Sequence, residues 1–422
     1  MNQATATSEA AAQARAEAFA LPLDQIDVTK PRLFQDDTIG HYFERLRRDD
    51  PVHFHRNQFY GGFWSVTKYK DIMAVDTSHG VYSSDWSNGG IGLFDGPMDD
   101  RLQTFIAMDP PKHDEQRKSV SAIVAPANLA SMQGTIRERT IKVLDGLPRN
   151  ETFNWVERVS IELTTQMLAT LFDFPFEDRK LLTWWSDVTT SVPGLDHIVA
   201  SPEARQAELG HCLAYFTRLW NERVNAPPRG DLVSMLAHAP ATRNMSAREY
   251  LGNLLLLIVG GNDTTRNSMT GGLYALHQHP AEFAKLRANP ALVESMVPEI
   301  IRWQTPLPHM RRTALADAEL GGKQIRKGDK VVMWYLSGNR DEEAITNANQ
   351  FIIDRARPRQ HLSFGFGIHR CVGNRLAEMQ LRILWEEILN RVPVIEVVGE
   401  PRRTLSNFVR GFTHLPVRLP AA

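Results

Sequence analysis

Residues 364–373 read Phe364-Gly365-Phe366-Gly367-Ile368-His369-Arg370-Cys371-Val372-Gly373 and form a glycine-rich loop around one cysteine. Apolar residues follow at positions 376, 379, 383, 384 and 388, a spacing that predicts an amphipathic helix directly after the loop. A cysteine at a helix N-terminus has its thiolate favoured by the positive end of the helix dipole. The glycines allow the backbone to approach a flat cofactor closely. The loop therefore predicts a thiolate placed against a bound group.

Three other roles for Cys371 have to be weighed against this interpretation. A lone cysteine is most often a small buried hydrophobic residue. A zinc site shared with His369 requires four closely grouped nitrogen or sulfur ligands, and Cys212 is the only other cysteine. A catalytic nucleophile requires its own base and oxyanion donors, which the motif does not identify. The loop as a whole favours the cofactor interpretation over these three.

A second informative segment is a long helix predicted between Ser246 and His279. Ser246 and Glu249 match a capping box, and Pro280 follows the last helical turn. Because residues 254–259 are apolar all round, the helix is expected to cross the middle of the protein, buried on all sides. Its centre, Gly-Gly-Asn-Asp-Thr-Thr at 260–265, consists of weak helix formers and predicts a local distortion. These polar residues are either satisfied core groups or catalytic groups, and the segment alone does not decide between them.

The rest of the chain predicts one large, mainly helical domain. Short β-rich stretches at 52–54, 62–66 and 331–335 predict strands. No repeat and no long linker divides the sequence, so a single domain over residues 21–422 is expected. Residues 1–20, rich in Ala, Gln, Thr and Glu, predict a flexible N-terminal tail without the features of a signal peptide.

Charge and cysteine content exclude several classes of function. The 48 basic and 49 acidic residues leave a net charge of -1, so no global field attracts nucleic acid or an anionic membrane. Two cysteines in 422 residues are typical of a cytosolic protein without structural disulfides. The longest apolar run, residues 254–259, is far shorter than a membrane span. We therefore expect a cytoplasmic protein that neither binds nucleic acid nor spans a membrane.

Three motifs together resemble those of the cytochrome P-450 family. The loop is similar to the family's haem-binding loop at its defining positions, Phe364, Gly367, His369, Cys371 and Gly373. Two further signatures stand in the right order upstream, Glu299-Ile300-Ile301-Arg302 and Gly260-Gly261-Asn262-Asp263-Thr264. The resemblance covers the chain from about residue 21 onward. It implies the soluble bacterial type of this fold, mainly α with small β-sheets (α+β), and a haem-thiolate monooxygenase.

The resemblance also implies a role for each matching residue. Cys371 would be the axial ligand of the haem b iron, within a loop shaped by Phe364, Gly365, Gly367 and Gly373. The expected partners of the haem propionates are His113, Arg117, Arg312 and His369, through charge-assisted hydrogen bonds. Asp263 and Thr264 would relay protons to O2, while Gly260 and Gly261 would leave room for it above the haem.

Glu299 and Arg302, taken alone, could be an exposed ion pair of little energetic value. The resemblance implies instead a buried structural network that includes Arg355, with Arg357 as a second candidate.

Residues 260–268 and 306–312 resemble a bacterial subfamily that hydroxylates the terminal (ω) methyl groups of alkanes and fatty acids. This implies a medium-chain alkane, a fatty acid or a related aliphatic substrate, with candidate pocket residues Leu256, Val259, Leu307 and Phe408. The loop 85–94 is glycine-rich and is a candidate lid. Two alternatives stay open: a hydroxylase of a terpene, steroid or macrolide, and a haem sensor without oxygenase activity.

Electrons must come from outside, because the chain contains no flavin or iron–sulfur segment. The resemblance implies a ferredoxin with two iron and two sulfur atoms, reduced from NADH by an FAD-containing ferredoxin reductase. Arg117, Arg370 and Arg375 are candidates for the docking patch. One departure from the family pattern, Glu378 where an arginine is common, leaves the details of docking open.

Overall fold

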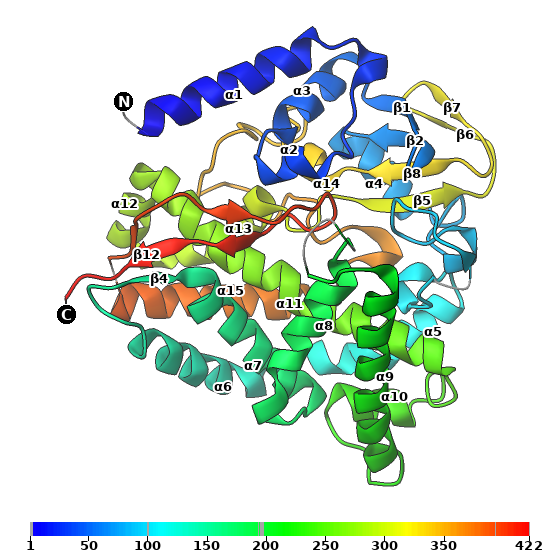
Figure 1. Cartoon of the computed structure of the whole chain (residues 1–422), viewed down its shortest axis with the longest axis vertical. Helices are drawn as coiled ribbons and strands as arrows, with labels where there is room; N and C mark the ends of the chain where they lie inside the picture. The colour runs from blue at the N-terminus through cyan, green and yellow to red at the C-terminus, as the bar shows by residue number, and fades with distance from the viewer. Residues whose placement is uncertain (1–2, 99–100, 193, 195–197, 393, 422) are drawn as a thin grey trace.

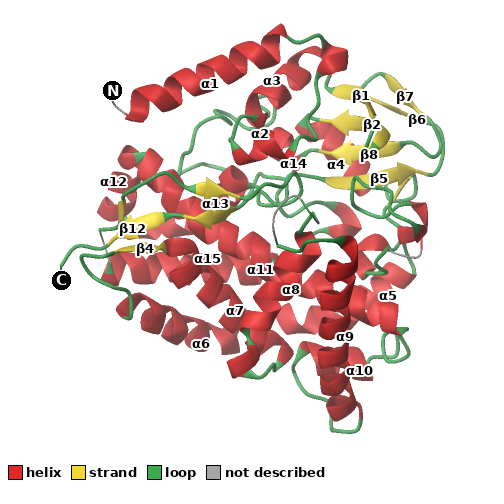
Figure 2. Cartoon of the chain, viewed as in Figure 1, coloured by secondary structure: helices red, strands yellow, loops and turns green. Residues whose placement is uncertain are grey.

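The computed structural model describes residues 3–98, 101–192, 194, 198–392 and 394–421. About 55% of the chain is helical and 10% is strand, as the sequence predicts. Helices fill most of the molecule, and the largest sheet lies at one side, at the upper right of Figure 2. Among the described residues, no helix is long and apolar enough to cross a membrane.

Helix α11 (Ala247–Gln278) runs through the middle of the helical part (Figure 1). Ser246 and Glu249 form the predicted capping box, and His279 is the C-cap. The helix packs against α7 (Glu162–Phe172), α8 (Lys180–Thr190), α13 (Val293–Gln304) and α15 (Asn374–Arg391). Two expectations are corrected: the helix is continuous through 260–265, and Leu256, Leu257 and Val259 are only half-buried.

The largest sheet has the strand order β1-β2-β8-β5-β3. Its strands are β1 (Val52–Asn57), β2 (Gly61–Val66), β8 (Lys330–Met333), β5 (Met310–Ala314) and β3 (Tyr82–Ser83). Only β2 and β8 are parallel neighbours. The strands predicted at 52–54 and 62–66 are confirmed, whereas the third ends at Met333, and Trp334 and Tyr335 lead into the short helix α14 (Tyr335–Gly338).

The remaining elements surround this framework. The other helices are α2 (Pro31–Gln35), α3 (Ile39–Asp49), α4 (Tyr69–Thr77), α5 (Lys112–Ser121), α6 (Pro126–Asp145), α9 (Pro202–Val224), α10 (Leu232–His238) and α12 (Pro280–Ala288). The smaller sheets pair β4 (Thr152–Asn154), β12 (Pro416–Arg418) and β9 (Glu396–Val397), then β10 (Arg402–Arg403) with β11 (Phe412–His414), and β6 (Ala318–Leu320) with β7 (Lys323–Ile325).

The segment expected to be an N-terminal tail is instead a helix, α1 (Gln3–Ala20). Its many alanine, glutamine and glutamate residues are strong helix formers, and its C-terminal end packs against α3. Ala18 is fully buried there, and Arg15 forms an ion pair with Glu44 at 2.6 Å. The contacts with α3 are tertiary contacts, which the composition of residues 1–20 does not reveal. Residues 1 and 2 lie outside the described residues.

Candidate active site

The cysteine loop is closed by its own backbone and by contact with α4. The Cys371 N–H donates to the Phe364 carbonyl at 2.8 Å. Gly365 and Gly367 both have φ near +65°, a left-handed conformation that favours glycine. A Cβ atom on Gly367 would overlap the carbonyl oxygen of Asp76, so only glycine permits this close approach. Helix α15 then begins at Asn374, as the periodicity predicts.

Cys371 is accessible to solvent, although enough protein surrounds its thiol to affect the pKa. Burial raises the pKa of this thiol, whereas the Gly373 N–H, Arg117 and Arg370 act to lower it. The expected stabilisation of the thiolate by the helix terminus is therefore outweighed by burial in the free protein. Cys212 differs, because its side chain is fully buried in the helical core.

Two histidines meet beside the loop and each has one nitrogen without a partner. The rings of His113, on α5, and His369 are steeply inclined to each other, with centroids 4.3 Å apart. His369 Nε2 bonds to Ser84 Oγ at 2.7 Å, and His113 Nδ1 bonds to Asp114 at 2.7 Å. His113 Nε2 and His369 Nδ1 are buried without a hydrogen-bond partner among the described residues. Burial lowers the pKa of both rings, that of His369 to about 2, so His369 is neutral at physiological pH.

The two arginines expected beside them have partners within the chain. Arg117 donates to the Arg370 carbonyl. Arg312 lies on β5 and donates to Asp76 Oδ1 at 2.8 Å. Asp76 Oδ2 accepts from the Phe366 N–H at 2.8 Å and from the Tyr335 hydroxyl at 3.0 Å. Asp76 therefore joins Arg312 to the cysteine loop, a function that its neighbours in sequence do not signal.

The middle of α11 presents different groups to different neighbours. Gly260 is exposed, with open space where a Cβ would lie, and the Thr264 hydroxyl donates to its carbonyl at 2.9 Å. A Cβ on Gly261 would instead lie 2.7 Å from Leu168 of α7. The expectation that both glycines leave open room is therefore wrong for Gly261, whose lack of a side chain permits close packing of two helices.

Asp263 is completely buried and belongs to a charged group between α11 and α8. Its carboxylate lies 2.8 Å from Arg266, which also contacts Asp187 at 2.6 Å. Burial raises the pKa of Asp263 to about 6, although Arg266 acts to lower it. The carboxyl group can therefore both hold and release a proton near neutral pH.

The structure brings Glu299, Arg302 and Arg355 together in a buried network. Arg302 binds Glu299 through two hydrogen bonds of 2.7 and 2.8 Å, and Arg355 donates to the same carboxylate at 2.9 Å. The Ile352 N–H adds a fourth bond at 2.8 Å. Arg302 also donates to the Asn339, Ala348 and Gln350 carbonyls, which anchors the chain before the cysteine loop.

The four candidate pocket residues, Leu256, Val259, Leu307 and Phe408, are all half-buried. The Phe408 ring lies 5.6 Å from that of His309. The candidate lid is fastened to β5, because Arg311 donates to the Asn88 and Gly92 carbonyls and pairs with Asp95. Arg311 also occupies the space beside Gly89.

Comparison with known proteins identifies the family. Residues 220–411 match the family model for cytochrome P-450. The linalool 8-monooxygenase of Pseudomonas putida is 36% identical over 409 residues, which is 94% of this chain and 99% of that protein. The chain belongs to the cytochrome P-450 family. Two solved P-450 structures are similar: cytochrome P-450-153 from Novosphingobium aromaticivorans (45% identity, 93% and 99% coverage, TM-score 0.86) and CYP153D17 from Sphingomonas sp. PAMC 26605 (47%, 95% and 100%, 0.87).

Cytochromes P-450 require haem, and the residues of this site fit it. Cys371 offers an accessible sulfur at the loop, and His369 Nδ1 can donate to a carboxylate when its Nε2 accepts from Ser84. His113 donates through Nδ1 to Asp114, so its Nε2 would bind a propionate only in the protonated ring, a form that the charge of the propionate would favour. Arg312 would share its guanidinium between a propionate and Asp76. When bound, the haem supplies an iron whose thiolate ligand favours cleavage of the O–O bond.

Two neighbouring residues of α11, Asp263 and Thr264, could deliver protons in this P-450 reaction. The Thr264 hydroxyl is held toward the Gly260 carbonyl, so it can exchange that acceptor for a reacting oxygen. Asp263 lies on the buried side of the helix, where burial raises the pKa of its carboxyl group, so it could hold a proton for such a transfer.

Replacing Asp76 with asparagine is expected to weaken haem retention. The amide would keep the size of the side chain but leave the buried Arg312 without its charge partner, a type of change that costs about 3–5 kcal/mol. Transfer of haem to apomyoglobin measures this loss. Asp317→Asn is the control because Asp317 pairs with Arg326 on the surface. Equal haem retention in the two variants would contradict the role given to Asp76.

Proposed function

We propose that this P-450 hydroxylates the terminal methyl group of a medium-chain alkane, a fatty acid or a related aliphatic molecule. The observation that carries the proposal is the resemblance of residues 260–268 and 306–312 to the alkane and fatty-acid ω-hydroxylases. The chain shares 45% and 47% sequence identity with the solved structures of cytochrome P-450-153 and CYP153D17. These identities support placing all three proteins in one subfamily.

The names of more distant relatives point to selective attack on one carbon. Linalool 8-monooxygenase and a steroid C26-monooxygenase of Mycobacterium tuberculosis, 36% and 32% identical, are both named for a numbered position. Selectivity for a single position requires a site that holds the substrate in one orientation. The same requirement applies to a terminal methyl group, whereas the substrates in these names, a terpene alcohol and a steroid, belong to the alternative hydroxylase class.

The accessible face of α11 supports an apolar substrate. Leu256, Gly260 and Thr264 are four residues apart and share one face, and none of them is buried. The apolar Leu256 side chain and the open space at Gly260 would hold the end of a narrow aliphatic substrate close to the Thr264 hydroxyl. Positioning of this kind is what oxidation of an unreactive methyl group requires.

The test is product analysis with purified protein, a surrogate ferredoxin and its reductase. We expect octane and octanoic acid to be oxidised mainly at the terminal carbon, as measured by gas chromatography and mass spectrometry. Linalool and a steroid are the comparison substrates for the alternative hydroxylase activity. Faster turnover of either comparison substrate than of octane would contradict the aliphatic assignment, and haem without any turnover would favour a sensor.

We also propose that electrons reach this site from NADH through an FAD-containing reductase and a two-iron, two-sulfur ferredoxin. Arg370 and Arg375 are exposed beside the cysteine loop and would face an acidic partner. Glu378, the departure from the family pattern, is paired with Arg359 at 2.8 Å. Its charge is therefore offset locally, which removes its conflict with such a partner.

Replacing Thr264 with alanine is expected to uncouple electron use from product formation. Without the hydroxyl, the proton supply to the reacting oxygen is disturbed, and reduced oxygen leaves as hydrogen peroxide. The measurement is the ratio of product to NADH consumed, which should fall several-fold while peroxide rises. Thr264→Ser is the matched control because it keeps the hydroxyl. Normal coupling in the alanine variant would remove Thr264 from the relay.

A further inference from the structure

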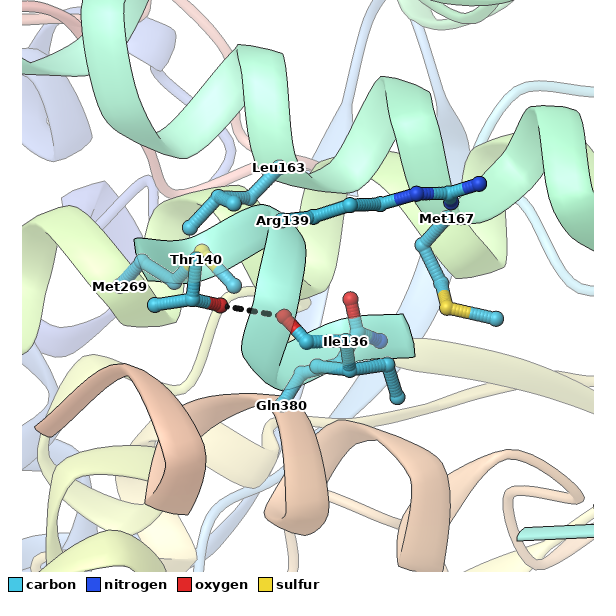
Figure 3. Close-up of a pocket in the computed structure, with 7 residues that line it drawn as sticks. All are labelled: Ile136, Arg139, Thr140, Leu163, Met167, Met269 and Gln380. Atoms are coloured by element: carbon cyan, nitrogen blue, oxygen red, sulfur yellow. Dashed lines mark hydrogen bonds between the residues drawn. The ribbon is translucent and has the colours of Figure 1, made fainter. Parts of the chain in front are cut away.

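Two cavities in the described residues differ in character. A small one of about 10 Å³ lies among α6, α7, α11 and α15, where Thr140 bonds to its own helix (Figure 3). It has room for at most about one water molecule. The other measures about 180 Å³ and lies between α3, α11, α13, α14 and the strand pair β10–β11. None of the residues assigned above to the haem or to proton delivery lines this larger cavity.

The larger cavity, here called the arginine cavity, carries an excess of positive charge. Arg47, Arg340, Arg403 and Arg410 line it, and Asp37 is the only carboxylate among the described residues of its lining. Asp37 accepts from Arg403 at 2.8 Å and from Arg410 at 2.7 Å. The four guanidinium groups therefore exceed the single carboxylate by three charges.

Two of these arginines have no carboxylate partner among the described residues. Arg47 donates to the Ser337 hydroxyl at 2.9 Å. Arg340 donates to the Trp303 carbonyl at 3.2 Å, and its guanidinium lies 3.6 Å from the centroid of the Trp303 ring. Burial lowers the pKa of Arg47 to about 10. Burial also lowers the pKa of Arg340, and the positive charges of Arg302 and Arg410 lower it further. Three positive charges without a carboxylate to balance them make this cavity electrostatically unfavourable.

Two guanidinium nitrogens of the cavity are also left without acceptors. Arg403 Nη1 and Arg410 Nε are buried and make no hydrogen bond within the described part of the chain. Their side chains are 10% and 8% exposed. A buried donor without an acceptor costs about 1–3 kcal/mol, so a ligand with several acceptor oxygens would relieve both the charge and the unmade bonds.

We propose that the arginine cavity binds a phosphate dianion, either as inorganic phosphate or as the phosphate group of a small phosphomonoester. Arginine is the residue best suited to phosphate because its planar fork matches two oxygens at once. Asp37 has a side chain that is 41% exposed and marks the edge from which a ligand would enter. The proposal is independent of which substrate the P-450 oxidises.

The test is isothermal titration calorimetry of the haem-loaded protein in phosphate-free buffer at constant ionic strength. We expect inorganic phosphate to bind one site per chain with a Kd below about 1 mM. Glycerol 3-phosphate is the second probe, and binding at least tenfold tighter would assign the site to an organic phosphate. Absence of saturable binding by both probes would overturn the proposal.

Variants locate the binding. Arg403→Gln and Arg340→Gln should each weaken phosphate binding at least tenfold, whereas Arg402→Gln should not, because Arg402 is exposed and does not line the cavity. Arg47→Gln serves if either variant fails to fold, and the carbon monoxide spectrum of the haem checks folding in each case. Equal affinity in the cavity variants and in Arg402→Gln would place the binding elsewhere and overturn the proposal.

Discussion

Replacement of Cys371 by histidine is expected to abolish monooxygenase activity while leaving a protein that can still bind haem. The thiolate pushes electron density onto the iron and favours O–O cleavage, and an imidazole does not supply the same push. The reduced protein with carbon monoxide should lose the strongly red-shifted Soret band and show the band of a histidine-ligated haem. We expect the turnover that depends on the thiolate ligand to be lost completely.

Cys212 provides the matched control, since the chain has only these two cysteines. Cys212 is fully buried in the helical core, away from the accessible loop. Cys212→Ala should keep the red-shifted band and the activity, at a modest cost in stability from the lost packing. A red-shifted band that persists in Cys371→His, or disappears in Cys212→Ala, would show that the ligand is wrongly assigned.

Replacement of Glu299 by glutamine is expected to cause a large loss of stability. The substitution leaves Arg302 and Arg355 buried without their shared carboxylate. Breaking a buried pair in this way costs about 3–5 kcal/mol. For a chain of this length, the usual unfolding entropy per residue converts that cost to a fall in melting temperature of roughly 3–6 °C.

The control for this variant is Glu396→Gln, the same substitution in an ion pair on the surface. Glu396 binds Arg418 at 2.8 Å, with side chains 43% and 50% exposed. Such pairs contribute about 0–1 kcal/mol, so the melting temperature should change by roughly 1 °C or less. Scanning calorimetry of both variants with bound haem makes the comparison. Equal melting temperatures would mean that the Glu299 network is not what holds this region together.

Features that depend only on neighbouring residues were predictable from the sequence. The Ser246–Glu249 capping box set the start of α11, and the Gly365-to-Cys371 spacing indicated a tight loop before a helix. Both depend on local backbone chemistry, which neighbouring residues determine. The family resemblance added the grouping of Glu299, Arg302 and Arg355, whose separation along the chain no local rule spans.

Other features were decided only by the tertiary structure. Gly260 and Gly261 are equivalent in sequence, yet only the packing of Leu168 shows which of them is open. Asp76 reaches Arg312 across 236 positions of the chain, and the arginine cavity collects residues from 37 to 412. The sequence by itself determined where helices such as α11 begin and which residue types form the site. The fold decided which charges meet, because electrostatic partners are set by distance in space and a buried charge is stable only where another segment supplies its counterpart.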